Sequence, residues 1–266
     1  AVFIGTGAGY PSFMGIHGES LGGVLSANEW LTRCNLMRGR DFPNFDTPLQ
    51  PGKRVAVIGA GNTAMDAMRV SLRVCAEKVS CIYRRSAAEA PARAEEIHHA
   101  HQEGVDFQWL TSPVELIGDS NKNVRAMRCE RMELGEPDAS GRRRPVPVPG
   151  SAFEIETDMV VFAIGTNANP ILGQTSGLKL DKRGYIATDE HLATSIAGVY
   201  AGGDIVTGAA TVIQAMGAGR KAARGMKAWL GLRDTDSVYL QESAEPGGRL
   251  FGIDRRERNF ARLHLA

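Results

Sequence analysis

The sequence lacks the segments by which several classes of protein are recognised. It has four cysteines, Cys34, Cys75, Cys81 and Cys129, and no two of them form the Cys-x-x-Cys pair of zinc sites, iron–sulfur clusters or redox dithiols. No apolar run approaches the roughly 20 residues that span a bilayer, and no signal peptide is visible. We therefore expect reduced thiols in a cytoplasmic protein, without a bound metal or a membrane anchor.

The sequence also lacks an excess of charge of either sign. It has 31 Lys and Arg against 30 Asp and Glu, a formal net charge of +1. The overall charge therefore does not favour binding to nucleic acid or to an anionic membrane surface. Hydrophobic residues make up 43% of the chain, and its 266 residues suffice for one large domain or two ordinary ones. These values predict a globular protein.

The most informative stretch is residues 53–66, KRVAVIGAGNTAMD. An apolar strand at residues 55–58 runs directly into a glycine turn, which opens a helical run at residues 63–74. A Gly-x-Gly-x-x-Ala match is weak by itself, but a strand before it and a helix after it are the context of a dinucleotide site. The stretch therefore predicts nucleotide binding, with an ordinary turn between a strand and a helix as the alternative.

Each residue type in this turn has a physical role. Gly59 permits the tight turn at the strand end, Gly61 lets the backbone approach a pyrophosphate, and Ala64 is small enough for the helix to pack on its strand. The pyrophosphate would lie at the helix N-terminus, where unpaired amides and the helix dipole favour negative charge. The predicted phosphate-binding residues are Gly59, Gly61, Asn62, Thr63 and Ala64.

The next strand, residues 79–83, ends in a pair of arginines. A site for NAD usually has an acidic residue there, about 20 residues beyond the glycines, to bind the ribose hydroxyl. Arg84 and Arg85 would instead pair with a 2′-phosphate, so the sequence favours NADPH over NADH. Arg93 is a further phosphate candidate. The alternative is that Arg84 and Arg85 are solvated surface side chains.

Three histidines in the following helix suggest a metal at first sight. His98 and His101 share a helix face, but His99 points elsewhere and no further cluster of ligands accompanies them. We therefore expect surface histidines and no metal site.

Residues 106–133 are typical of a β meander between helical units. The loop at residues 135–150 carries four prolines and Arg142, Arg143 and Arg144. We interpret it as a mobile or edge connection whose arginines are solvated, with a docking patch as the alternative.

The N-terminal stretch, residues 1–8, is typical of a buried strand that runs into a glycine turn. It starts without a preceding turn, so we expect the chain to be cut from a longer one. It is not a second nucleotide loop, because Tyr10 occupies the third-glycine position and Pro11 follows. A helix at residues 26–37 and a proline-rich linker at residues 38–52 are predicted next.

A second glycine turn follows the apolar strand near residue 200 and ends in Asp204. Its carboxylate is able to accept a hydrogen bond from a polyol hydroxyl. A long helix is predicted at residues 210–230, and its first amides, at Ala210, Thr211 and Val212, offer a helix N-terminus to an anion or a carbonyl. The alternative is that Asp204 caps a turn.

Together these motifs resemble the flavoproteins that have two dinucleotide-binding domains. Residues 59–66, 83–85, 91–93 and 198–204 look most like the small (beta) subunit of NADPH-dependent glutamate synthase, and the resemblance covers about residues 1–230. Electron-input subunits of the ferredoxin:NADP transhydrogenase type and of the pyrimidine-reductase type are similar enough to remain alternatives.

The resemblance implies an α/β fold in which a Rossmann-like, three-layer nucleotide-binding domain is inserted into a second, incomplete FAD-type domain. Residues 51–170 would form the NAD(P)H domain, and residues 1–50 and 171–232 the rear part of the FAD domain. Residues 233–266 match nothing, and are expected to form an amphipathic helix or a loosely ordered tail. Asp204 would hold the ribityl chain of FAD, and the helix start at residues 210–212 would face the flavin. Gly165 and Gly203 complete the expected cofactor-binding residues.

The resemblance also implies what this chain does. NADPH would pass a hydride to FAD, and the electrons would go on to a larger catalytic or iron–sulfur subunit. The family's first glycine motif, which binds the FAD pyrophosphate, and its N-terminal cluster cysteines have no counterpart here. We therefore expect NADPH binding with FAD held weakly or not at all, and no catalytic acid, base or nucleophile. A nucleotide-binding or docking fragment without turnover is the rival interpretation.

Overall fold

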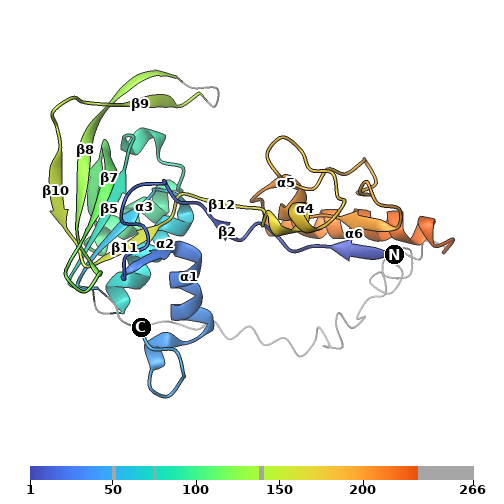
Figure 1. Ribbon diagram of the computed structural model, residues 1–266, viewed down its shortest axis with the longest axis horizontal. Helices are drawn as coiled ribbons and strands as arrows, with labels where there is room; N and C mark the ends of the chain where they lie inside the picture. Colours follow the sequence, from blue (N-terminus) through green and yellow to red (C-terminus); the bar gives the residue numbers. More distant parts are fainter. Residues whose placement is uncertain (50–51, 75, 138–140, 233–266) are drawn as a thin grey trace, which may run out of the picture. The chain divides into compact units, whose positions relative to one another are not determined.

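The computed structural model describes residues 1–49, 52–74, 76–137 and 141–232. The chain divides into two compact units (Figure 1). One consists of Gly9–Asn167 and is called the inner unit here. The other combines Ala1–Ala8 with the described residues from Ala168 onward and is called the split unit.

The inner unit is built on a five-stranded sheet with the order β3-β11-β4-β5-β6, in which every pairing is parallel. Its strands are β3 (Val24–Ser26), β4 (Arg54–Ile58), β5 (Lys78–Tyr83), β6 (Asp106–Trp109) and β11 (Met159–Phe162). β4 lies in the middle, with Val57 opposite Cys81 of β5 and Val161 of β11. The predicted strands at residues 55–58 and 79–83 are confirmed.

Alternate residues of the central strand enter two different cores. Val55 and Val57 face the helices α1 (Ala27–Leu31), α2 (Asn62–Arg73) and α3 (Ala94–Gln102). Ala56 and Ile58 face an antiparallel meander, whose strands are β7 (Thr111–Gly118), β8 (Val124–Pro137) and β10 (Phe153–Glu156). Figure 1 shows the sheet between these two coverings. The period of two in a strand produces this division, and the expected three-layer α/β fold is confirmed.

The second half of β8 extends beyond the sheet and pairs with β9 (Arg143–Pro147), forming a hairpin arm (Figure 1). Pro145 lies opposite Leu134, and Pro147 opposite Met132. Residues 135–150 were expected to be a loop because of their prolines. A proline fits a strand that pairs on one side only, since its missing amide then faces away from the ladder. Arg143–Pro147 of the expected loop therefore form an edge strand.

Two other features differ from the sequence prediction. β3 pairs with β11, Val24 opposite Val160, so residues 9–50 belong with the central sheet and not with the strand at residues 1–8. Ser26 caps α1 as predicted, its Oγ accepting a hydrogen bond from the amide of Glu29. The α-helical part ends at Leu31, and the chain continues directly as a π-helix at Thr32–Leu36. The predicted linker contains a short 3₁₀ helix, Gly39–Asp41, and residues 50 and 51 lie outside the described residues. The chain enters the inner unit through β2 (Tyr10–Pro11) and leaves it through β12 (Thr166–Asn167), and these two strands pair antiparallel.

The split unit has a two-stranded parallel sheet, β1 (Val2–Ile4) with β13 (Val199–Ala201). Its helices are α4 (Ile171–Thr175), α5 (Asp204–Thr207) and α6 (Val212–Trp229). A small core includes Tyr185, Ile186 and Ile205. The predicted helix at residues 210–230 is confirmed, whereas the tail from residue 233 lies outside the described residues. In the part of the chain that the structure describes, no helix is both long and apolar enough to cross a membrane.

Candidate dinucleotide-binding site

The turn after β4 requires glycine at its first position. Gly59 has φ +124°, and a Cβ there would lie 2.4 Å from the carbonyl oxygen of Ala163. Its amide donates a hydrogen bond to the carbonyl of Ile82 at 2.9 Å. The turn is therefore held tightly between the carboxyl ends of β5 and β11, the edge of a parallel sheet at which nucleotides bind.

The helix that follows starts without a side-chain cap. Gly61 is the N-cap residue of α2, and the first helical hydrogen bond runs from the amide of Met65 to its carbonyl. Asn62 and Thr63 are exposed, whereas Ala64 is buried against the sheet. A Cβ at Gly61 would meet only Pro91 Cγ, at 3.9 Å. No side chain thus caps the first turn of α2, where the sequence predicts that the backbone amides bind a pyrophosphate.

The loop at residues 84–93 lies beside the glycine turn. The amide of Ala92 donates to the carbonyl of Ala60 at 3.1 Å, and the amide of Arg93 donates to Oδ1 of Asn62 at 3.0 Å. Arg93 is exposed and is the N-cap residue of α3. Asn62 therefore uses its side chain to hold this loop, which places the loop carrying the predicted 2′-phosphate residues at the open helix start.

The two arginines after β5 have different surroundings. Arg84 is exposed, and within the described residues no ion pair or hydrogen bond holds its guanidinium. Arg85 is only 6% exposed, and its Nε donates to the backbone carbonyl of Arg143 in β9 at 2.8 Å. The sequence analysis assigned the same role to both arginines, whereas the structure places them in different surroundings.

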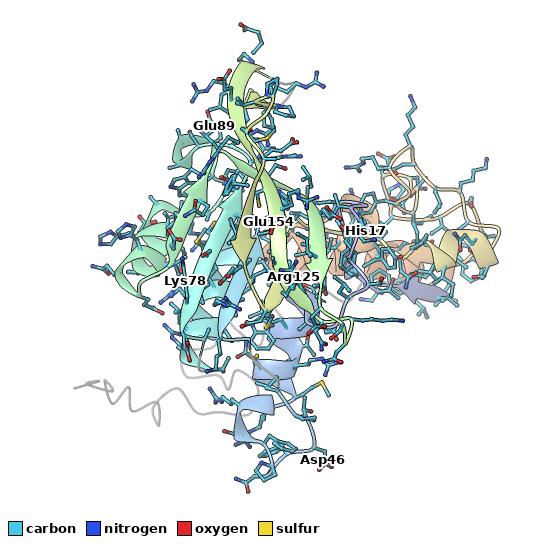
Figure 2. All side chains as sticks on the ribbon, turned by 60° about the vertical axis from the view of Figure 1, so that its left-hand side comes forward. His17, Asp46, Lys78, Glu89, Arg125 and Glu154 are labelled. Carbon is cyan, nitrogen blue, oxygen red and sulfur yellow. The ribbon has the colours of Figure 1, made fainter. Side chains whose placement is uncertain are left out.

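Glu89 connects this loop to the hairpin arm and was not predicted from the sequence (labelled in Figure 2). Its side chain is 8% exposed, and Oε1 lies 2.7 Å from Nε of Arg143. Ser86 donates to the other carboxylate oxygen, and Tyr83 Oη donates to the backbone carbonyl of Glu89 at 2.9 Å. The hydrogen bonds from Ser86 and then from Arg143 lower the pKa of Glu89 below its usual value. No sequence signal could have paired residues 89 and 143, because only the folded hairpin brings them together.

The second candidate site lies in the split unit. Gly203 has φ +78° and precedes Asp204, the first residue of α5. The carboxylate of Asp204 accepts no hydrogen bond from the described residues, so the alternative that it caps a turn is not what the structure has. At the start of α6, Thr211 and Gln214 form a capping box, in which the amide of Thr211 donates to Gln214 Oε1 at 3.0 Å.

The other predicted cofactor-binding residues are placed as follows. Ala210 and Val212 are exposed on either side of Thr211. Because the capping box occupies the amide of Thr211, an anion or carbonyl at this helix start would have to use the neighbouring amides. Gly165 lies in the inner unit with φ +107°, just beyond β11, and its carbonyl accepts from the amide of Ser12 at 3.1 Å. Gly165 thus belongs to the inner unit, three residues beyond the end of β11.

A search of protein-family models matches residues 1–219 to the pyridine nucleotide-disulphide oxidoreductase family. The chain belongs to this family. A similar relative is the beta subunit of NADP(+)-dependent formate dehydrogenase from Moorella thermoacetica, 47% identical over 234 residues, which are 86% of this chain and 32% of that protein. Another is the glutamate synthase [NADPH] small chain of Escherichia coli, 37% identical over 239 residues, 86% of this chain and 50% of that protein. This chain therefore spans about a third to a half of the length of these relatives.

Among solved structures, the complex of Mycobacterium tuberculosis FprA with NADPH superimposes with a TM-score of 0.67. It is 20% identical and covers 91% of this chain and 68% of its own. The likeness supports the fold. The resemblance expected from the motifs, to glutamate synthase small chains and related oxidoreductase subunits, is confirmed by the relatives.

The three cysteines that the structure describes in this member of the pyridine nucleotide-disulphide oxidoreductase family are not arranged for disulfide exchange. Cys34, Cys81 and Cys129 are buried and free, and Cys75 lies outside the described residues. Burial raises the thiol pKa to about 11 for Cys34 and to about 12 for Cys81 and Cys129, which disfavours the reactive thiolate. Within the described residues, no group of three His, Cys, Asp or Glu side chains could hold a metal ion.

Proposed function

We propose that this chain is the NADPH-binding part of an electron-input flavoprotein. The inner unit would bind NADPH, and the split unit would contribute to an FAD site. The observation that carries the proposal is the uncapped N-terminus of α2, preceded by a turn in which Gly59 admits no side chain and Gly61 faces open space. Membership of the pyridine nucleotide-disulphide oxidoreductase family supports it.

The choice of NADPH over NADH rests on the loop at residues 84–93. Its exposed guanidiniums, Arg84 and Arg93, belong to a loop that is hydrogen-bonded to the glycine turn. A guanidinium pairs well with the phosphate dianion on the ribose of NADPH. The unphosphorylated ribose of NADH would form no such ion pair. Arg85 would support the loop through the carbonyl of Arg143 and would not read the phosphate itself.

The cofactors would supply the chemistry, the dihydronicotinamide giving a hydride to the isoalloxazine ring. The residues of this chain bind and orient. The amides of Asn62 and Thr63 would hold the pyrophosphate. The carboxylate of Asp204, which accepts no hydrogen bond from the described residues, would accept one from a ribityl hydroxyl. Since Cys34, Cys81 and Cys129 are buried with raised pKa, disulfide reduction through these three thiols is disfavoured.

We further propose that the electrons leave for a partner subunit or an iron–sulfur domain. The relatives are named as a beta subunit of formate dehydrogenase and a small chain of glutamate synthase, which supports assembly with a larger protein. The free state of Cys34, Cys81 and Cys129 supports a cytoplasmic location, where thiols stay reduced.

Calorimetric titration of the chain with NADPH and NADH tests the nucleotide site. We expect NADPH to bind more tightly, and Arg84→Ala to weaken NADPH by roughly tenfold while changing NADH by less than about twofold. Single replacement of Arg84 is the sharper experiment, because replacing the buried Arg85 would also disturb the hairpin arm. An equal loss for both nucleotides would remove the phosphate-reading role.

Reconstitution separates an oxidoreductase from a docking fragment. With FAD, NADPH and a dye acceptor, an oxidoreductase module bleaches the flavin absorbance and reduces the dye. A fragment that only binds nucleotide leaves both unchanged, even when titration shows that NADPH is bound. The control is NADH at the same concentration, which should act more slowly.

A further inference from the structure

The hairpin arm contacts the loop that carries Arg84, although the arm itself is not part of the proposed nucleotide site. Arg143 contacts this loop twice. Its backbone carbonyl accepts from Nε of Arg85 at 2.8 Å, and its own Nε lies 2.7 Å from Oε1 of Glu89. The arm is therefore fastened to both the start and the middle of the loop, while the end of the loop is fastened to the glycine turn through Ala92 and Arg93.

Glu89 is an unexpected residue at this place. The loop is the one proposed to receive the 2′-phosphate, and a carboxylate in the same loop would repel that group. Its side chain is almost fully covered, so water screens its charge poorly. Hydrogen bonds from Ser86 and the guanidinium of Arg143 keep it ionised, and Arg143 is the cation that neutralises it.

We propose that Arg143, through its ion pair with Glu89, is a positioning residue for selection of NADPH over NADH. The pair has two effects. It cancels a negative charge that only the phosphorylated cofactor would meet, and it fixes the loop so that Arg84 remains turned outward. This proposal rests on the proposed function of the same site, and it assigns a selectivity role to an arm that is distant in sequence.

The two members of the pair should respond in opposite directions. Arg143→Met leaves the carboxylate of Glu89 without its cation, and it should weaken NADPH by roughly tenfold with less than about twofold change for NADH. Glu89→Gln removes the repelling charge and leaves Arg143 in place, so NADPH affinity should stay within roughly twofold of the parent or rise. The double variant, Arg143→Met with Glu89→Gln, should recover most of the loss, because no unpaired carboxylate remains.

The measurement is calorimetric titration of the whole chain with NADPH and with NADH, with circular dichroism to establish that each variant is folded. The matched control is Arg144→Met, which removes the same charge from the neighbouring, exposed residue of β9 and should leave both affinities unchanged. A purely structural role for the pair predicts that both single variants weaken both nucleotides. If Arg143→Met fails to fold, the sign of the effect of Glu89→Gln still decides, since a loss of NADPH affinity there would overturn the proposal.

The outcomes also separate this inference from the proposed function. A parent chain that binds neither nucleotide removes the proposed function and this proposal with it. A parent chain that prefers NADPH, combined with equal losses of both nucleotides in Arg143→Met, overturns only the role of the ion pair. Equal effects of Arg143→Met and Arg144→Met would also overturn the role of the ion pair, because they would show that only the overall positive charge of the arm affects NADPH binding.

Discussion

The inner unit and the split unit differ in how they bury their apolar side chains. The inner unit covers both faces of a five-stranded sheet, and each face has its own core. The split unit has a two-stranded sheet, and at the start of α6 the side chains of Val212 and Ile213 are 76% and 82% exposed. A two-stranded sheet is marginal by itself, whereas a sheet covered on both sides is stable. Among the described residues, the comparison indicates that the inner unit is the more stable part and has the better-formed site.

The largest test of this comparison uses two tryptophans. Trp30 of the inner unit is 1% exposed, and its Nε1 donates to Ser71 Oγ at 3.1 Å. Trp229 of the split unit is 55% exposed and packs beside Gly198. We expect Trp30→Ala to lower the free energy of unfolding by about 3–5 kcal/mol, and Trp229→Ala to lower it by about 1 kcal/mol or less. Urea unfolding followed by circular dichroism measures both, and equal losses would contradict the comparison.

The second test uses the glycines of the turn, where stability and binding should separate. Gly59→Ala forces a Cβ to 2.4 Å from a backbone oxygen at a φ of +124°. We expect it to cost roughly 1–3 kcal/mol of stability and to abolish NADPH binding. Gly61→Ala has φ in the ordinary negative range and only Pro91 nearby, so the stability should change by less than about 0.5 kcal/mol.

Gly61→Ala should nevertheless weaken NADPH by roughly tenfold, because its methyl group would occupy the space through which the pyrophosphate approaches the backbone. Thermal unfolding and calorimetric titration of the two variants give the two quantities separately. Should Gly61→Ala bind NADPH as the parent does, the phosphate does not approach the backbone at residue 61. The turn would then be an ordinary connection between a strand and a helix.

The sequence predicted this turn because every signal for it is local. The apolar run of β4, the glycines and the start of α2 are adjacent in the chain, and the observed helix at Asn62–Arg73 differs from the predicted one by one residue at each end. The extent of the inner unit was not predictable in the same way. β3 joins the sheet by pairing with β11, and a run of prolines between β3 and β4 suggested a boundary that the strand pairing overrides.

The residues of the candidate site also differ in whether their prediction depends on local sequence or on contacts between distant elements. Gly59, Gly61 and Arg84 could be predicted as cofactor-binding residues because the prediction uses only their position in a motif. The different surroundings of Arg84 and Arg85 could not be read from the sequence, because they depend on the backbone carbonyl of Arg143 in β9. Local chemistry is thus visible in the sequence, whereas a residue that acts by contacting another element becomes visible only in the fold.

The smallest test compares the pH dependence of one aspartate from each unit. In the inner unit, burial and then the charge of Glu96 raise the pKa of Asp66, with Arg69 opposing. In the split unit, the amide of Tyr185 is the largest cause that lowers the pKa of Asp181, followed among the favourable contacts by those from Arg183. A raised carboxyl pKa means that ionised Asp66 destabilises the fold at neutral pH. A lowered one means that ionised Asp181 stabilises it above the unfolded pKa.

Asp66→Asn should therefore raise the melting temperature at neutral pH, and Asp181→Asn should lower it. Both differences from the parent should shrink as the pH falls, the first as the pH passes through the raised pKa of Asp66 and the second only later, as it approaches the lowered pKa of Asp181. Calorimetric melting of the parent and the two variants between about pH 7 and pH 3 measures these differences. The same sign for both variants at neutral pH would mean that the carboxylates are solvated alike, and that the contrast between a covered and an uncovered unit does not extend to their charged groups.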